Sequence, residues 1–197
     1  MFTGLIEEVG TVVQIERKKN FQRMEICAER MVQGMVEGDS ISIDGVCQTV
    51  VELSGQCFWV ESVNETLNCT TIGSMIVGCG VNLENPILAG GRFGGHIVLG
   101  HVDTTGSVVR FESDGENRIL EVETPDKLAR FIAPKGSIAV DGISLTVVEA
   151  LTTSFTVAII PHTLKHTNLS DRQIGNRVNL EIDVLARYVA RIIENSG

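Results

Sequence analysis

Two stretches of the chain, DSISIDGVCQTVVE at residues 39–52 and GSIAVDGISLTVVE at residues 136–149, carry the same pattern at a spacing of 97 residues. The match continues in VNLE at 81–84 and again at 178–181. Upstream, at a spacing of 96, GTVV at 10–13 matches GSVV at 106–109. A repeat this long in only two copies is not a solenoid and indicates two similar domains.

The repeat divides the chain into four parts. We expect one domain at residues 1–88, a glycine-rich linker AGGRFGG at 89–95, a second domain at 96–183, and a C-terminal segment at 184–197. Glycines at 90, 91, 94 and 95 suit a segment that turns between two units.

Short β-branched runs fill both halves, for example 11–15, 41–43, 49–51 and 58–60. Twenty glycines against four prolines predict many tight turns. Several short strands in a half of this size are typical of a small closed barrel. We therefore expect an all-β fold: two tandem, similar six-stranded Greek-key barrels with short helices and a C-terminal α-helix.

One short helix is expected in each half. In the second half Thr124 is placed to cap it, Pro125 suits its first position, and Pro134 ends it. Residues 28–35 are the corresponding stretch in the first half, with a weaker cap.

The C-terminal stretch 184–195 predicts an amphipathic helix, because Leu185, Tyr188 and Ile192 fall at three-then-four spacing. Its apolar stripe fits either of two roles. It can pack on its own barrel, or it can pair with copies of itself in an oligomer. The pattern alone leaves both open.

Charge and composition argue against several classes of protein. The net charge of −9 disfavours nucleic-acid binding, and no apolar run is long enough to span a membrane. The N-terminus lacks the basic region of a signal peptide, so a cytoplasmic location is expected. Five cysteines, an odd number without a CxxC pair, predict reduced thiols rather than disulfides or a zinc site.

The residues after the two Asp-Gly pairs are candidates for a binding face. Asp44-Gly45 and Asp141-Gly142 predict hairpin turns. Strand alternation then places Cys47 with Thr49, and Ser144 with Thr146, on one face each. These small polar groups either line a pocket for a polar heterocycle or simply suit a strand surface. The pattern by itself favours the second interpretation.

The histidines do not predict a metal site. His96 and His101 are five apart, which on a strand places them on opposite faces. His162 and His166 are expected in a loop with no third ligand. No phosphate-binding glycine loop, GxSxG elbow or HExxH helix is present.

Six motifs together resemble the riboflavin synthase family of the lumazine-binding superfamily: MFTG (1–4), GVCQTV (45–50), GGHIVLGH (94–101), KGSIAVDGISLTV (135–147), IPHTLKHTNL (160–169) and VNLEIDVLARY (178–188). The resemblance implies dismutation of two molecules of 6,7-dimethyl-8-ribityllumazine to riboflavin and 5-amino-6-(D-ribitylamino)uracil by transfer of a four-carbon unit, the last step of riboflavin biosynthesis. It implies no metal and no cofactor beyond the substrate and product as bound ligands. It also implies a homotrimer gathered by the C-terminal helix, with each site between barrels of two subunits, and an association with lumazine synthase.

The same resemblance implies the site residues. The first pocket would use Gly4, Leu5, Ile6, Cys47, Gln48, Thr49, Glu61, Ser62, Val63, Asn64, Glu65 and Thr66. The second would use Gly100, His101, Val102, Lys135, Ser144, Leu145, Thr146, Ala158, Ile159, Ile160, Pro161, His162 and Thr163. The resemblance also implies catalytic roles for His101, Ser144, Thr146, Cys47, Lys135, Asp141, Asp183 and Phe2.

Some positions depart from the family pattern. Gln48 stands where a leucine is usual and should point away from the pocket face. Leu99 replaces a frequent serine, Gly91 an aspartate, and Asn85-Pro86 the common Arg-Ala. No expected site residue carries an obviously disabling change.

Two other functions are weighed against the enzyme. A non-catalytic lumazine or flavin-binding protein of the same superfamily departs from the motifs GGH…GH and SLTV, which are intact here. An oligonucleotide-binding barrel needs a basic groove and stacking aromatics, whereas this chain has one Trp and one Tyr.

Overall fold

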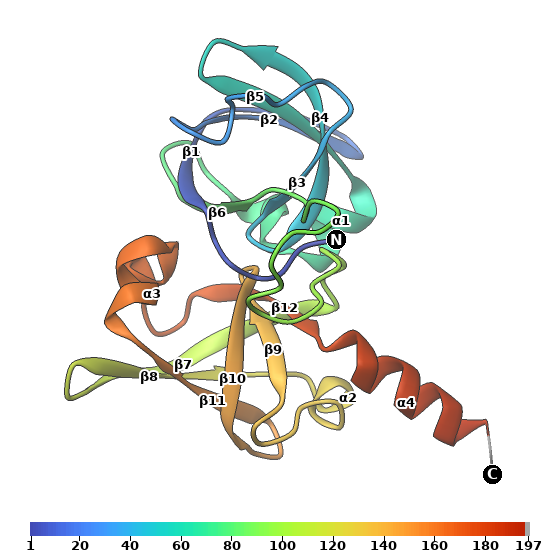
Figure 1. Ribbon diagram of the computed structural model, residues 1–197, viewed down its shortest axis with the longest axis vertical. Coiled ribbons are helices and arrows are strands. Elements are labelled where there is room, and N and C mark those ends of the chain that lie inside the picture. The colour runs from blue at the N-terminus through green and yellow to red at the C-terminus, as the bar shows by residue number, and fades with distance from the viewer. Residues whose placement is uncertain (196–197) are drawn as a thin grey trace.

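The computed structural model describes residues 1–195. Within that range the strands close into two antiparallel barrels that stand one above the other (Figure 1). Barrel 1 has the strand order β1-β2-β5-β4-β3-β6, and barrel 2 repeats the same cyclic order as β7-β8-β11-β10-β9-β12. The expected all-β fold of two similar six-stranded barrels with a C-terminal helix is therefore confirmed.

Barrel 1 and its short helices contain β1 (Glu8–Lys18), β2 (Phe21–Cys27), β3 (Ser40–Ile43), β4 (Val46–Ser54), β5 (Cys57–Val63), α1 (Asn64–Cys69), η1 (Thr71–Ser74) and β6 (Gly80–Glu84). Barrel 2 contains β7 (Thr104–Asp114), β8 (Asn117–Glu123), α2 (Asp126–Ala129), β9 (Ser137–Val140), β10 (Ile143–Ala150), β11 (Ser154–Ile159), α3 (Pro161–His166), η2 (Asn168–Asp171) and β12 (Arg177–Ile182). Helix α4 (Val184–Glu194) follows.

Each barrel encloses its own apolar core. In barrel 1 the inward positions of β2 are Gln22, Met24 and Ile26, alternating with half-buried residues as a strand requires. Met24 packs with Phe58 in one cluster, while Phe155 belongs to a separate cluster inside barrel 2. Burial of each large side chain contributes about 1.5–3 kcal/mol, so each half has a core of its own.

The two Asp-Gly turns are two-residue hairpin turns, as predicted. Asp44 and Asp141 both have φ 45°, and Gly45 and Gly142 have φ 79° and 80°. Both residues of each turn are left-handed, which defines a type I′ turn. The turns also pack on each other, because a Cβ on Gly45 would meet the Gly142 nitrogen at 2.6 Å. Glycine is thus required at the contact between the barrels.

The expected helices are only partly correct. Helix α2 exists but is one turn long, and the Thr124 hydroxyl is buried without a hydrogen-bond partner in the described chain instead of capping it. The prediction of a helix at 28–35 is wrong: this segment forms turns, because the Glu8 carboxylate binds its backbone N–H groups and Met31 and Met35 turn inward.

Helices α1 and α3, which sequence reasoning missed, follow directly after β5 and β11. The placement of His162 and His166 in a loop is therefore wrong. They lie one turn apart on α3, and their rings stack with centroids 4.1 Å apart.

The expectation that all thiols are reduced is wrong for one pair. Cys27 ends β2 and Cys57 begins β5, and strand pairing sets them opposite each other. A disulfide joins them although they are 30 residues apart in sequence. Cys47, Cys69 and Cys79 are free.

Helix α4 extends away from barrel 2 rather than covering it (Figure 1). Its apolar residues Leu185, Tyr188 and Val189 are exposed. The interpretation in which the stripe packs on its own barrel is therefore wrong. Of the expected helical segment 184–197, residues 196 and 197 lie outside the described part of the chain.

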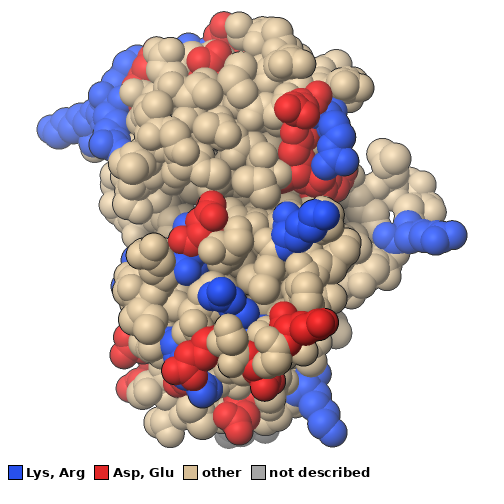
Figure 2. Space-filling view, turned by 90° about the vertical axis from the view of Figure 1, so that its left-hand side faces the viewer, with Lys and Arg blue, Asp and Glu red and all other residues tan. Residues whose placement is uncertain are grey.

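The helices of residues 1–195 are all too short or too polar to cross a membrane. On the face seen in Figure 2, basic side chains are interspersed with acidic ones.

Candidate functional site

The candidate residues after the hairpin turns face outward from their barrels. On β4, Cys47 is half-buried and Thr49 exposed, whereas Gln48 between them is buried. On β10, Ser144 and Thr146 face outward in the same way, and Leu145 lies in the core of barrel 2. The outer face of barrel 1 therefore carries a thiol and a hydroxyl, and the matching face of barrel 2 carries two hydroxyls.

Two arms cross between the barrels to reach these faces. The segment before β1 crosses to barrel 2, where the Ser144 N–H donates to the Gly4 carbonyl at 2.8 Å. The segment before β7 crosses to barrel 1, where the Cys47 N–H donates to the Gly100 carbonyl at 2.9 Å. Gly4 and Gly100 have φ 79° and 80°. A Cβ at either would lie 2.5 Å from the Cβ of the residue it faces, so only glycine fits.

The crossing changes how the expected pocket residues are grouped within one chain. Ile6 packs against the core of barrel 2, and Val102 packs against the core of barrel 1. Gly4, Leu5 and Ile6 therefore accompany Ser144, and Gly100, His101 and Val102 accompany Cys47. Both faces are built from both halves of the chain.

The remaining first-pocket residues lie beside β4. The Ser62 hydroxyl donates to the Gln48 Oε1 at 2.8 Å, and both side chains are buried, so Gln48 points away from the outer face as expected. Glu61 and Val63 are exposed at the end of β5. The stretch continues into the first turn of α1 with Asn64, Glu65 and Thr66.

The second half repeats this arrangement. Ala158 and Ile160 are exposed around the buried Ile159, and Pro161, His162 and Thr163 form the first turn of α3. Lys135 is exposed at a left-handed backbone position, φ 67°, two residues before β9. Its backbone N–H donates to the Val147 carbonyl at 2.8 Å, which fixes it at the start of the β9–β10 hairpin.

His96 is a candidate that sequence reasoning passed over. Its Nδ1 lies 2.7 Å from the Ser144 hydroxyl, and its buried Nε2 has no hydrogen-bond partner in residues 1–195. Burial lowers the pKa of His96, against the opposing charge of Asp183, and so favours a neutral imidazole. A neutral imidazole can exchange a proton with the Ser144 hydroxyl.

Three of the expected catalytic residues lie between the barrels or at a helix end. Phe2 is fully buried and pairs with Val98 across the two arms. Asp183 caps α4 by accepting from the Leu185 N–H at 2.9 Å. Asp141 is buried and accepts two hydrogen bonds from Arg172, at 2.7 and 3.0 Å. These positions suit support of the site more than contact with a ligand.

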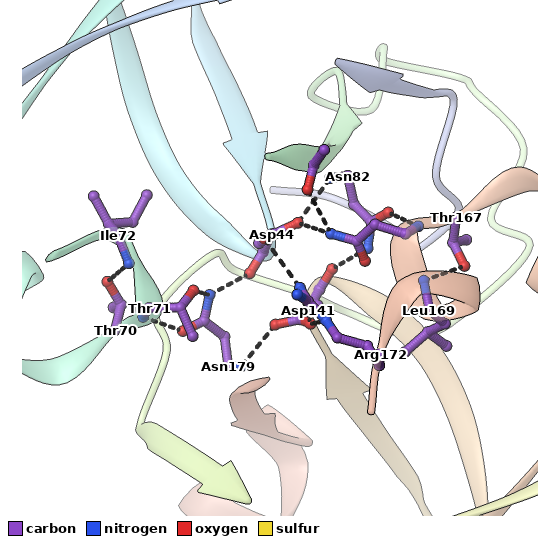
Figure 3. Close-up of polar contacts among 12 residues, drawn as sticks. Asp44, Thr70, Thr71, Ile72, Asn82, Asp141, Thr167, Leu169, Arg172 and Asn179 are labelled. Atoms are coloured by element: carbon purple, nitrogen blue, oxygen red, sulfur yellow. Dashed lines mark hydrogen bonds and ion pairs between the residues drawn. The ribbon is translucent and has the colours of Figure 1, made fainter. Parts of the chain in front are cut away.

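Asp141 belongs to a polar network on the pseudo-twofold axis between the barrels (Figure 3). The Asn82 side chain donates to the Asp141 carbonyl at 3.0 Å, and the Asn179 side chain donates to the Asp44 carbonyl at 2.8 Å. Arg172 ion-pairs with both aspartates, at 2.7 Å from Asp141 and 3.5 Å from Asp44. The network locks the two Asp-Gly turns together.

Two buried glutamates hold the crossing arms. Glu84, at the end of β6, accepts from the Thr3 and Gly4 backbone N–H groups. Glu181 in β12 accepts from the N–H groups of Leu99, Gly100 and His101 at 2.7, 2.9 and 3.0 Å. Their VNLE motifs were recognised as a repeat, but their side-chain role was not predicted, because the bonds span about 80 residues.

A cleft of about 810 Å³ opens beside the first arm. It is lined by Thr3 and Leu5 of the arm, by Met31 and Met35, and by Ser40, the strand partner of Thr49. Its size and its mixed apolar and polar lining suit a ligand of the size of a substituted heterocycle. In residues 1–195 no group of three or more His, Cys, Asp or Glu side chains could hold a metal ion.

The fold and the paired faces define a protein of two tandem barrels with a duplicated polar outer face. Residues 3–86 and 99–183 each match the lumazine binding domain family. Riboflavin synthase from Actinobacillus pleuropneumoniae is 44% identical over 98% of this chain and 90% of the relative. The riboflavin synthases of Mycobacterium tuberculosis and Bacillus subtilis are 42% and 35% identical, each over all of this chain and over 100% and 92% of the relative. The chain therefore belongs to the lumazine-binding family, and within it to the riboflavin synthases.

Solved structures share the fold. The crystal structure of LumP complexed with riboflavin matches with a TM-score of 0.87 at 23% identity, over 92% of this chain and 99% of LumP. LumP complexed with 6,7-dimethyl-8-(1'-D-ribityl) lumazine gives a TM-score of 0.85 at 22% identity.

Proposed function

We propose that the chain catalyses the dismutation of two 6,7-dimethyl-8-ribityllumazine molecules to riboflavin and 5-amino-6-(D-ribitylamino)uracil. The observation that carries this is the duplication of the site: two identical substrates need two similar faces, and the chain has one on each barrel. The match to riboflavin synthases over the whole chain supports the enzyme rather than a non-catalytic binder.

The chemistry follows from the substrate. The ring delocalises the charge left when the position-7 methyl group loses a proton, so one lumazine becomes a nucleophile and the other accepts it. The four-carbon unit then moves from donor to acceptor. Holding both rings in a near-attack orientation lowers the barrier by up to about 7–11 kcal/mol, so no separate cofactor is needed.

Proton transfer falls to the polar side chains of the two faces. We assign general acid–base roles to His101, Ser144 and Thr146, and we place His96 behind Ser144 as its proton partner. Cys47 contacts the acceptor lumazine. Lys135 is exposed near the second face and is placed to donate a hydrogen bond to a ring carbonyl.

We further propose a cytoplasmic homotrimer in which the N-terminal face of one subunit meets the C-terminal face of another. The exposed apolar residues of α4 support this assembly, because a helix that does not cover its own barrel is free to pair with copies of itself. An association with lumazine synthase would supply the substrate.

The direct test is incubation with ribityllumazine while riboflavin absorbance is followed. One riboflavin should form for every two lumazines consumed. Binding of lumazine without formation of riboflavin would contradict the enzyme and support a non-catalytic chromophore-binding protein.

His101→Ala should lower kcat by about 10²–10⁴-fold, the usual contribution of a general acid–base group, with the fold retained. Glu116→Ala is the control, since Glu116 is exposed in the turn between β7 and β8 and lies outside the proposed sites. Unchanged steady-state rates in His101→Ala would remove His101 from the mechanism.

A further inference from the structure

Each of the two arms lies against one of the binding faces, and each is held by both barrels. Gly100 shows this most clearly. Its N–H donates to Glu181 of barrel 2 at 2.9 Å, and its carbonyl accepts from Cys47 of barrel 1 at 2.9 Å. The position of His101, the next residue, is thus set by a carboxylate of one barrel and by the binding face of the other.

The carboxylates are deeply placed. Glu84 and Glu181 are 3% and 2% exposed, and no lysine or arginine pairs with either in the described chain. Burial raises the pKa of both carboxyl groups, and the backbone N–H groups oppose that rise. Successive N–H groups that converge on one anion form a small anion-binding nest, so the loop folds around the carboxylate.

Each buried glutamate and the backbone N–H groups that it binds form a clamp on one arm. The two clamps have the same geometry, but the arms that they hold carry different side chains. Thr3, Gly4 and Leu5 correspond to Leu99, Gly100 and His101 at a spacing of 96. Glu84 gains an extra donor, the Thr3 hydroxyl at 2.8 Å, which Leu99 cannot supply to Glu181. Only the arm held by Glu181 carries a titratable side chain, His101, directly after the glycine.

We propose that Glu181 is a positioning residue for catalysis, which presents His101 of the second half at the Cys47 face of the first, while Glu84 performs the equivalent task for substrate binding at the Ser144 face. Neither glutamate touches the reacting atoms. Each acts through the arm that it holds, and each barrel thereby shapes the site on the other barrel. The inference rests on the proposed synthase activity.

The matched pair Glu181→Ala and Glu84→Ala tests this. Each variant removes one buried carboxylate and its backbone bonds, so both should lose comparable thermal stability. Glu181→Ala should lower kcat by about 10²-fold with KM for ribityllumazine changed less than about threefold, since a misplaced catalytic group costs rates of that order. Glu84→Ala should raise KM at least about tenfold and lower kcat less than Glu181→Ala does, because the arm held by Glu84 carries Leu5, whereas Ser144 and Thr146 are held by β10 itself.

Glutamine variants keep the test decisive where an alanine variant does not fold. The side chain introduced by Glu181→Gln retains one carbonyl oxygen for the Gly100 and His101 N–H groups and loses only the acceptor for Leu99, so kcat should fall by less than about tenfold, the cost of one hydrogen bond. Equal effects of the two sites on kcat and KM, or no recovery with glutamine, would show that the clamps act on stability alone. A wild-type protein that forms no riboflavin would refute the proposed function instead, and the two failures are therefore distinguishable.

Discussion

Arg172 breaks the symmetry between the two central aspartates. The matching position in the first half, 97 residues earlier, is Met75, so one cation serves both carboxylates. Arg172 lies closer to Asp141 than to Asp44. Burial, followed by the negative charge of Asp141, raises the pKa of Asp44 to about 8. Asp44 thus holds a proton in the folded protein at pH values where the unfolded chain has lost it.

The raised pKa of Asp44 determines how the stability of the protein changes with pH. A carboxyl group whose pKa is raised on folding binds its proton more tightly in the native state, so stability falls as pH rises from about 4 towards 8. Asp44→Asn should flatten this fall, by at most about 1.4 kcal/mol per pH unit. Urea unfolding between pH 4 and 8 measures it, with Asp114→Asn in an exposed hairpin as control. Parallel curves for wild type and Asp44→Asn would contradict the assignment.

For single residues, the sequence predicts well which face of a strand a side chain occupies. It predicts poorly which residues far away in the chain that side chain contacts. Alternation after an Asp-Gly turn predicts Cys47 and Thr49 on one face of the strand and Gln48 on the other, and the structure shows that the first face is the outer one. The contact of His96 with Ser144 joins residues 48 apart, and no local periodicity encodes it. The same holds for Glu181, whose bonds depend on how two barrels meet.

Among the elements, the strand pair β2–β5 carries a covalent link that its counterpart lacks. In barrel 2 the corresponding strands place Ser154 opposite Glu123 where barrel 1 has Cys57 and Cys27. Barrel 2 closes without such a link, so the shared fold does not itself require the disulfide. It adds stability to one half only.

Cys57→Ser should lower the free energy of unfolding by about 3–4 kcal/mol under oxidising conditions, the chain-entropy value for a loop of this length. Dithiothreitol should produce the same loss in the wild type and none in the variant. Cys69→Ser, a free thiol, is the control and should change stability by less than about 0.5 kcal/mol. A wild type insensitive to dithiothreitol would contradict the link.

Helix α4 has an exposed apolar face. Leu185 and Tyr188 are 62% and 63% exposed, although ion pairs of Arg187 with Asp103 and of Arg130 with Glu194 attach the helix to barrel 2. Deleting residues 184–197 should therefore reduce the trimer to smaller species with the barrels intact. Light scattering measures the mass, and a trimer that persists without the helix would contradict the proposed assembly.

Short helices were the least predictable elements. The stretch 28–35 has helix-forming residues, but the Glu8 carboxylate and the inward turn of two methionines decide its conformation. Helices α1 and α3 have no side-chain cap and end after six residues, so they leave little local signal. The long repeat, by contrast, fixed the number and similarity of the barrels, because it does not depend on any single contact.

For the molecule as a whole, the arms and the central network make the barrels one cooperative unit. Trp59 is the only tryptophan and lies in barrel 1, so its fluorescence reports that half, while far-UV circular dichroism reports both. The two unfolding curves of the wild type in urea should coincide. Two separate transitions would contradict a single unit.

Arg172→Met, which places in the second half the residue found in the first, should weaken this coupling. Loss of one partner of a buried ion pair costs about 3–5 kcal/mol, because the buried carboxylate of Asp141 is left without its cation. We expect the fluorescence and circular dichroism curves to separate in this variant. Arg177→Met, at an exposed residue on the neighbouring strand, is the control and should keep them coincident.

The two barrels exchange their arms in the way that two identical subunits exchange an element in a symmetric, domain-swapped dimer. Phe2 and Val98 still pair across that axis, each N–H donating to the other's carbonyl. Because both copies lie in one chain, each position can differ from its counterpart in the other half. Arg172 stands where the first half has Met75, and His101 stands where it has Leu5. The two halves can therefore take different roles, one binding the donor molecule and the other the acceptor.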